Sequence, residues 1–277
     1  MTSTHHMLRT APDGPLSEAL LAVTDLKRSF ERIGLAWSLA WHDVVARYRG
    51  SILGPFWITL SMGVMVLGIG LLYAQLFKLP VRDYMPFVAL GIVLWGLIST
   101  TLTESCDTFV QAAGMLRQTA LPLLTFTWRT VMRNVINLAH HAVIIVLVVA
   151  FYGYWKVMNL PVALLGLGLV VVNIGWIGLI ISIAAARFRD VPQIVGSVMQ
   201  FAVFMTPVFW KPDAIPERHA ILLFNPFYYM LQAVRAPLLG ETTRDGTYLF
   251  LVLMALAGWA TAFGLFSVTR RRIVHYL

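Results

Sequence analysis

The chain has little charge and almost no cysteine. Of its 277 residues, 12% are Asp, Glu, Lys or Arg and 58% are hydrophobic. Soluble domains have about a quarter of their residues charged, so this composition argues against a soluble enzyme and against disorder. The single cysteine, Cys106, excludes an intrachain disulfide and any CxxC metal or redox site. These absences favour a polytopic helical membrane protein.

Motifs for nucleotide or hydrolytic chemistry are also missing. No Gly-Lys pair occurs, which excludes a GxxxxGK[ST] phosphate loop, and no HExxH, GxSxG or paired-carboxylate arrangement stands out. We therefore predict no catalytic residue, no metal and no cofactor in this chain. The basic residues follow membrane topology, so no nucleic-acid partner is expected. If transport is driven by ATP, another chain must bind the ATP and Mg²⁺.

Six apolar stretches are long enough to cross about 30 Å of hydrocarbon as helices. Fourteen of the 21 Lys and Arg residues lie in segments on the N-terminal side of the membrane. Cytoplasmic segments are enriched in these residues, so both termini are expected in the cytoplasm. No basic region leads into an apolar stretch with a cleavage site, so no signal peptide is expected. The predicted spans are 52–77, 84–106, 132–155, 161–186, 193–211 and 247–268.

An amphipathic helix is predicted before the first span. Residues 1–34 form a cytoplasmic N-terminal segment, Gly34 breaks the helical pattern, residues 35–50 form the amphipathic helix, and residues 51–277 form the transmembrane domain. The pattern is typical of a helix lying in the membrane interface; packing on a soluble domain is the alternative, and the chain leaves no room for one. Aromatic and apolar side chains share one face, opposite the charged ones: Trp37, Trp41, Val44 and Tyr48 against His42, Asp43, Arg47 and Arg49.

The segment 212–246 is apolar and aromatic but too short for two further spans. We interpret it as a re-entrant helical hairpin that dips into the outer leaflet and is hinged near Asn225–Pro226. Non-helical backbone at that depth needs a covering of protein or water. A loop lying flat in the interface is the alternative. The predicted fold is thus an all-α polytopic membrane protein with six transmembrane helices, an interfacial helix and this hairpin.

Polar residues inside the predicted spans are few. Glu104 and Asp107 close the second span, where a polar cluster at a helix end is favoured over a proton site. Asn134, Asn137 and His141 share one face of the third span, where interhelical hydrogen bonding is favoured over a proton relay. The near absence of embedded carboxylates argues against an ion-coupled transporter.

Aromatic side chains gather after the fifth span and in the hairpin. Aromatic faces can stack on the apolar faces of sugar rings and guide a glycan without tight binding. An aromatic belt facing lipid explains the same pattern equally well. The candidate channel aromatics are Phe201, Phe204, Phe209, Trp210, Phe227, Tyr228 and Tyr229.

Three stretches in this order resemble the membrane subunit of ABC-2 type polysaccharide exporters, and the region around the first span is most similar to O-antigen export permeases. They are Arg47–Trp57, Ala186–Pro192, and Thr206–Trp210 followed by Asn225–Pro226 and by Arg235, Leu238, Leu239 and Gly240. The resemblance covers about residues 35–272. It implies a permease of the bacterial inner membrane that exports lipid-linked polysaccharide, assembled as a homodimer with two copies of a separate ATPase.

The resemblance also implies roles for particular residues. A coupling helix at about 112–122 would insert into the ATPase, next to the turn between spans four and five. Spans one and five would form a lateral gate for a polyprenyl-linked glycan, and the hairpin would cap the outer mouth. The coupling residues would be Gly114, Met115, Leu116, Arg117, Leu121, Pro122, Arg187, Arg189 and Asp190; the interfacial and gate residues would be Trp37, Trp41, Arg47, Tyr48, Arg49, Gly54, Pro55 and Trp57.

Other functions stay open at this point. Within the same superfamily, the cargo could be capsule, teichoic acid, another lipid-linked glycan or a small drug. An ion-coupled secondary transporter and a membrane-embedded glycosyltransferase or acyltransferase belong to different classes. The few embedded carboxylates argue against the transporter, and only His140–His141 hints at the transferase.

Overall fold

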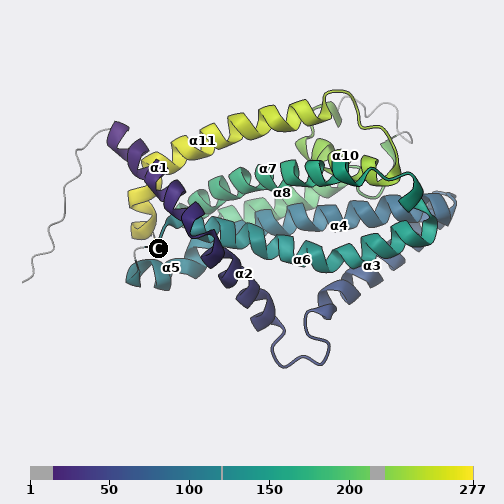
Figure 1. Ribbon diagram of the computed structural model, residues 1–277, viewed down its shortest axis with the longest axis horizontal. Coiled ribbons are helices and arrows are strands. Elements are labelled where there is room, and N and C mark those ends of the chain that lie inside the picture. Colours follow the sequence, from purple (N-terminus) through teal and green to yellow (C-terminus); the bar gives the residue numbers. More distant parts are fainter. Residues whose placement is uncertain (1–14, 120, 213–221, 277) are drawn as a thin grey trace, which may run out of the picture.

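The structure is a computed structural model that describes residues 15–119, 121–212 and 222–276, and every regular element in these ranges is helical. The long helices lie side by side along the long axis (Figure 1). The all-α prediction is confirmed over these ranges. In chain order the elements are α1 (Pro15–Glu31), α2 (Ile33–Arg47), α3 (Phe56–Leu76), α4 (Val81–Ser105), α5 (Thr108–Gln118), α6 (Leu123–Tyr152), η1 (Tyr154–Lys156), α7 (Leu160–Arg187), α8 (Val191–Met205), α10 (Pro226–Leu239) and α11 (Thr247–Tyr276).

Among the described residues, five helices are long and apolar enough to cross a membrane: α3, α4, α6, α7 and the Thr247–Ile273 part of α11. They match five of the six predicted spans. The third span was predicted to begin too late, because α6 already begins at Leu123. The fifth, 193–211, is only partly helical, since α8 has 15 residues and ends at Met205. A helix of that size is about 22 Å long, short of the hydrocarbon thickness.

Helix α4 is the centre of the bundle. In its most apolar window 83% of the residues are buried, against 11% in α3. It contacts α3, α6, α7, α8 and α10. Its Tyr84, Leu90 and Ile98 are among the largest fully buried side chains of the molecule. Five helices therefore pack around α4, while α2 packs on α6 and α11 packs on α7.

The two ends of the bundle differ. At one end, here the α5 end, α5 lies beside the C-terminal part of α11, and α1 crosses over α11 and α6 (Figure 1). The opposite end, here the α10 end, carries η1, α10 and the start of α11. The helical break predicted at Gly34 falls instead at Arg32, the N-cap of α2. A glycine inside a helix costs only about 1 kcal/mol, which packing can offset.

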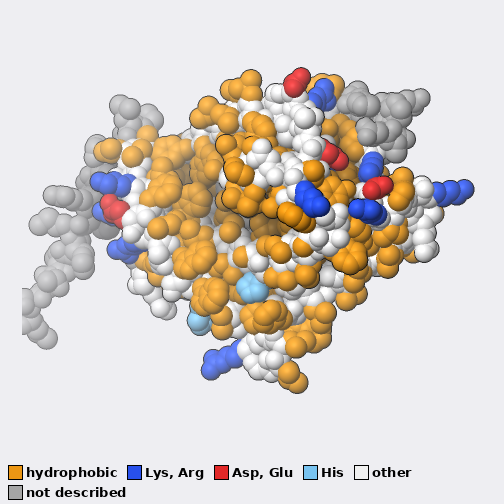
Figure 2. Space-filling view, turned by 45° about the vertical axis from the view of Figure 1, so that its right-hand side comes forward, with side chains coloured by type: hydrophobic (Ala, Val, Ile, Leu, Met, Phe, Trp, Pro, Cys, Tyr) orange, Lys and Arg blue, Asp and Glu red, His pale blue; other side chains and the backbone are white. Residues whose placement is uncertain are grey.

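The surface agrees with a membrane location. Hydrophobic side chains cover most of the visible face, and charged side chains gather mainly toward the ends and edges (Figure 2). Many large apolar side chains of α3 are exposed, including Phe56, Val64, Leu72 and Leu76. In water such a surface would be costly, whereas lipid tails solvate it well.

Candidate functional site

Helix α2 packs on α6 through small residues. Ala36, Ala40 and Val44 are buried, and the last two form a cluster with Ile136 of α6. Trp37 and Trp41 are 49% and 51% exposed. Of the predicted face, Trp37 and Trp41 are therefore directed away from the bundle, whereas Val44 is buried against it. This arrangement leaves the two indoles available to lipid headgroups.

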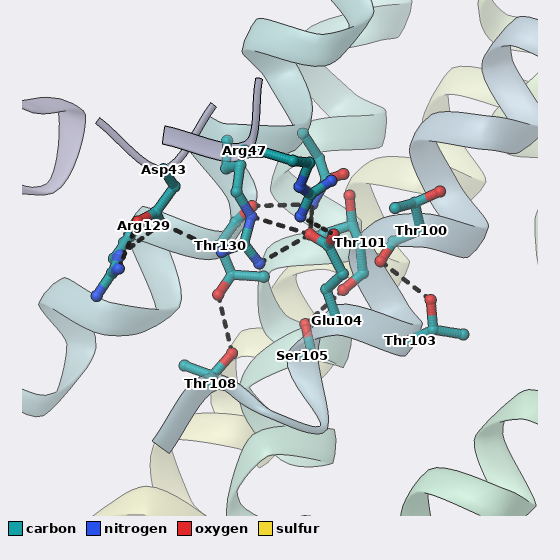
Figure 3. Close-up of polar contacts among 12 residues, drawn as sticks. Asp43, Arg47, Thr100, Thr101, Thr103, Glu104, Ser105, Thr108, Arg129 and Thr130 are labelled. Carbon is teal, nitrogen blue, oxygen red and sulfur yellow. Dashed lines mark hydrogen bonds and ion pairs between the residues drawn. The ribbon is translucent and has the colours of Figure 1, made fainter. Parts of the chain in front are cut away.

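An ion-pair network joins α2, α4 and α6 (Figure 3). Asp43 of α2 receives two hydrogen bonds from Arg129, at 2.7 and 2.6 Å, and one from Arg133 at 3.2 Å. Glu104 of α4 accepts bonds from Arg133 at 3.0 and 2.8 Å and from Asn134 at 2.8 Å. Arg47 of α2 approaches the other Glu104 oxygen at 3.3 Å.

Arg133 connects the two carboxylates and is itself almost buried, with 7% of its side chain exposed. Forked Arg–carboxylate pairs are strong and geometrically specific. Burial raises the pKa of Asp43, but the hydrogen bonds and positive charges of Arg129 and Arg133 outweigh it and lower the pKa below 3.8. Asp43 is therefore ionised at neutral pH, and α2 is held electrostatically to α6.

Helix α5, the predicted coupling helix, stands beside this network. It runs from Thr108 to Gln118, so it begins and ends earlier than the predicted 112–122. The Thr108 hydroxyl lies 2.9 Å from that of Thr130, one residue after Arg129 on α6. Helix α5 therefore contacts α6 one residue away from an arginine that holds α2.

The predicted coupling residues fall into exposed and packed groups. Gly114 and Arg117 are exposed and Met115 is half-buried, whereas Leu116 is buried in the core. Leu121 and Pro122 lie beyond α5 in the connection to α6, half-buried and buried respectively. The exposed positions could contact another chain without disturbing the core.

The turn between α7 and α8 lies at the same end of the bundle. Arg187, Arg189 and Asp190 are all exposed. The Arg187 guanidinium lies over the rings of Phe188 and Tyr276, with its carbon 5.1 and 5.8 Å from their centroids. This turn and α5 thus present polar side chains at one end of the molecule.

Helix α1 adds a contact that the sequence did not suggest. Asp25, 4% exposed, accepts hydrogen bonds from the backbone N–H groups of Leu123 and Leu124, at 3.4 and 3.3 Å. It also pairs with Arg270 of α11 at 3.3 Å. The first N–H groups of a helix have no partner within it, so Asp25 caps α6 from another element.

The connection from α2 to α3 contains several of the predicted gate residues. Gly50 and Gly54 have φ angles of 83° and 54°, which glycine adopts without strain. Pro55 is the N-cap of α3. The loop projects from the long side of the bundle (Figure 1). Tyr48 is half-buried, whereas Arg49 and Trp57 are exposed.

The α10 end closes over the broken end of α8. Thr206 is extended, as expected for a residue before proline, so α8 stops there. The Asn225 amide donates to the carbonyl of Met205 at 3.2 Å, and Arg235 donates to that of Pro207 at 2.7 Å. Backbone freed from the helix is thus covered by α10. The first half of the predicted hairpin includes 213–221, which lie outside the described residues.

The candidate channel aromatics have different environments. Phe201 and Phe204 of α8 are 66% and 64% exposed. Tyr228 and Tyr229 are both buried, and Tyr229 stacks on Phe250 at 4.3 Å. The remaining three, Phe209, Trp210 and Phe227, are half-buried. Among the seven candidates, only Phe201 and Phe204 are exposed.

Segments around the predicted gate meet at the α10 end. Phe209 stacks on Tyr73 of α3 at 6.1 Å, and its carbonyl accepts a hydrogen bond from Tyr84 of α4. Helix α3 otherwise contacts mainly α4 and α6, and α8 contacts α4 and α7. The two predicted gate helices thus pack on the same central helix and are bridged at one end.

Sequence reasoning missed the key polar contacts. Arg129 and Arg133 served only to predict the orientation of the chain in the membrane, and Asp25 was not considered. The available signal was the spacing of charges four apart on α6, which places both arginines on one face opposite the acidic residue of an amphipathic helix.

Comparison with known proteins agrees with this architecture. The family described as ABC-2 type transporter matches residues 34–239, more than half of the chain. The chain is 25% identical over 200 residues to an O-antigen export system permease protein RfbA of Klebsiella pneumoniae, covering 70% of this chain and 75% of the relative. It is 24% identical over 217 residues to the Myxococcus xanthus protein of that name, covering 76% and 82%. The chain therefore belongs to the ABC-2 type transporter family.

Proposed function

We propose that this chain is the permease of an ATP-driven exporter that moves lipid-linked polysaccharide, of the O-antigen class, across the bacterial inner membrane. The proposal rests on the family and on the similarity to O-antigen export permeases. The working unit is a homodimer with two copies of a separate ATPase, which binds ATP and Mg²⁺. This chain supplies the pathway and no catalytic group.

The structural observation that supports coupling to an ATPase is the linked arrangement at the α5 end. An exposed α5 stands on α6, α6 holds α2 through Asp43 and Arg133, and α2 leads directly into α3. Movement of an ATPase against α5 would be transmitted to α3, one side of the lateral gate. This end would face the cytoplasm.

The chain crosses the membrane six times in this proposal. Helix α8 leaves the α5 end, and the extended segment after it reaches Tyr73 and Tyr84 near the α10 end. The fifth passage would then be part helix and part extended backbone, covered by α10 as a re-entrant element. The exposed Phe201 and Phe204 would face the glycan path between protomers.

The test is co-purification with the ATPase candidate, comparing Arg117→Glu with Arg82→Glu. Both arginines are exposed, but Arg117 lies on α5 and Arg82 at the opposite end. We expect Arg117→Glu to weaken ATPase binding about tenfold, the effect of about 1.4 kcal/mol of lost charge complementarity, and Arg82→Glu to leave it unchanged. ATP hydrolysis by the native complex should respond to lipid-linked glycan. Purification without any ATPase, with solute movement down an ion gradient, would contradict the proposal.

A further inference from the structure

Two hollows lie in line along the seam between α3 and α6. The first has a volume of about 230 Å³ and contains polar groups from α2, α4 and α6. The second has a volume of about 390 Å³ and is lined by apolar side chains of α3, α4 and α6, with the ring of Tyr152. On α3, Ser61 and Met62 line the first, while Gly63 and Val66 line the second. The two hollows are thus neighbours along the same helices.

The polar pocket contains groups that the protein itself does not satisfy. Within the described part of the chain, the side chains of Asn137, Thr100 and Tyr48 have no hydrogen-bond partner. Asn137 and Thr100 lie inside α6 and α4, two helices that can cross a membrane. Both side chains are half-buried, so their free donors and acceptors can form hydrogen bonds with a polar ligand in the pocket.

The chemistry of the polar pocket suits a sugar ring. An amide, a hydroxyl and a phenol can donate to and accept from sugar hydroxyls. Apolar side chains share the pocket, among them Met62, Leu97 and Leu138, and can cover the C–H face of a ring. Arg47 is the only Lys or Arg among its lining residues, so a strongly anionic ligand is not required.

The second hollow, here called the apolar groove, indicates what would be attached to that sugar ring. Its lining includes Val66, Leu67, Ile144, Leu147 and Phe151. Leu67, Leu147 and Phe151 are exposed on the surface of the bundle, where lipid would reach them. A molecule with a sugar head and an apolar tail would fill both hollows at once, whereas a sugar without a tail would leave the groove to lipid.

We propose that the α3–α6 seam binds one molecule of a sugar-headed lipid, with a sugar ring in the polar pocket and the apolar tail in the groove. The natural ligand, a lipid-linked saccharide, rests on the proposed function. The site itself rests on the two adjoining hollows. The pocket also adjoins the ion-pair network, since Asn134 lines it and donates to Glu104.

The binding experiment uses the full chain in lipid nanodiscs with two photoreactive probes. One is octyl glucoside with a diazirine in its alkyl chain, and the other has the same chain under a phosphocholine head. We expect the glucoside to label residues 63–67 and 144–151, and excess unreactive octyl glucoside to compete. Asn137→Leu and Thr100→Val should each reduce labelling about fivefold, the loss expected for one hydrogen bond of about 1 kcal/mol.

Thr103→Val is the matched control on α4. The Thr103 hydroxyl donates to backbone carbonyls of its own helix and does not line the pocket, so labelling should be unchanged. Two results would overturn the proposal. Equal labelling by the phosphocholine probe would show that the seam binds lipids in general, without selecting a sugar head. If glucoside labelling is unchanged in both Asn137→Leu and Thr100→Val, the polar pocket does not bind a sugar ring.

A second measurement separates this site from the proposed function. In the complex with the ATPase, the two pocket variants should raise the KM for lipid-linked glycan about fivefold and leave kcat unchanged. If hydrolysis responds to glycan but KM does not change in either variant, the site is wrong and the exporter stands. If the labelling pattern is as expected but hydrolysis responds to no glycan, the site stands and the exporter is wrong.

Discussion

Arg133 is the residue on which the association of α2 with the bundle depends most. It donates to Asp43 on one side and to Glu104 on the other, with little access to solvent. Removing a buried partner leaves unpaired charges behind, which costs far more than losing an exposed pair. Arg47 contacts the same Glu104 but is 48% exposed, so it provides a matched comparison.

We predict that Arg133→Gln lowers the free energy of unfolding by about 2–3 kcal/mol, somewhat below the range for fully buried pairs because both carboxylates are partly exposed. Arg47→Gln should cost less than about 1 kcal/mol, as for exposed pairs. Thermal unfolding in detergent, followed by tryptophan fluorescence, measures both. Equal effects of the two substitutions would show that Arg133 does not hold the network together.

Some residue-scale predictions agree with the structure and others only in part. The polar cluster at the end of the second span is confirmed for Glu104, whereas Asp107 is exposed. Interhelical hydrogen bonding is confirmed for Asn134, which donates to Glu104. Asn137 was also expected to form an interhelical hydrogen bond, but its side chain lines the polar pocket between α3 and α6. Residues on one helical face meet different neighbours, which helix periodicity cannot reveal.

At the scale of elements, α1 acts as a strap across α6 and α11. It precedes the family match, which begins at residue 34, yet Asp25 joins the start of α6 to Arg270 of α11. Glu18 adds a pair with Arg271 at 2.8 Å. Because α6 begins just after α5, this strap fixes the point at which the proposed coupling helix joins the bundle.

We predict that Asp25→Asn lowers the free energy of unfolding by about 1–2 kcal/mol, because it weakens the cap of α6 and leaves Arg270 without its charge partner. Glu18→Gln, which removes a more exposed pair, should cost less than about 1 kcal/mol. The same fluorescence melt compares them. If Asp25→Asn unfolds at the same temperature as the native chain and Glu18→Gln unfolds at a lower one, α1 is held by Glu18 in its first turn rather than by Asp25.

Helix α8 shows how far local sequence reasoning reaches for an element. The stretch 193–211 is mostly apolar, so hydropathy predicts one span. Pro207 was noted near its far end, and the restriction that proline places on Thr206 ends the helix at Met205. Asn225 and Arg235 donate to the carbonyls of Met205 and Pro207 at this break, and so help to satisfy the backbone that the helix leaves unpaired. Those partners come from later in the chain, so only the tertiary structure shows them.

At the scale of the whole molecule, the number of membrane passages decides which segments lie on the same side of the membrane. We predict that Arg189→Cys is labelled by an impermeant maleimide only from the cytoplasmic side, and Thr242→Cys only from the outside. Both positions are exposed, and the native Cys106 is buried, so background labelling is low. Labelling of both cysteines from one side would mean that α8 does not complete a passage and would exclude six spans.

The sequence by itself determined the class of protein: few charges and long apolar stretches indicate a multi-pass helical membrane protein, and the three stretches described above resemble ABC-2 type exporters. It could not distinguish the two helices that matter most for the architecture. Helices α3 and α4 have the same mean hydropathy, 1.9, yet 11% and 83% of their most apolar windows are buried. Lipid tails are as apolar as leucine, so hydropathy marks what enters the membrane but not what faces protein. Only the packing of α3, α6, α7, α8 and α10 around α4 decided that difference.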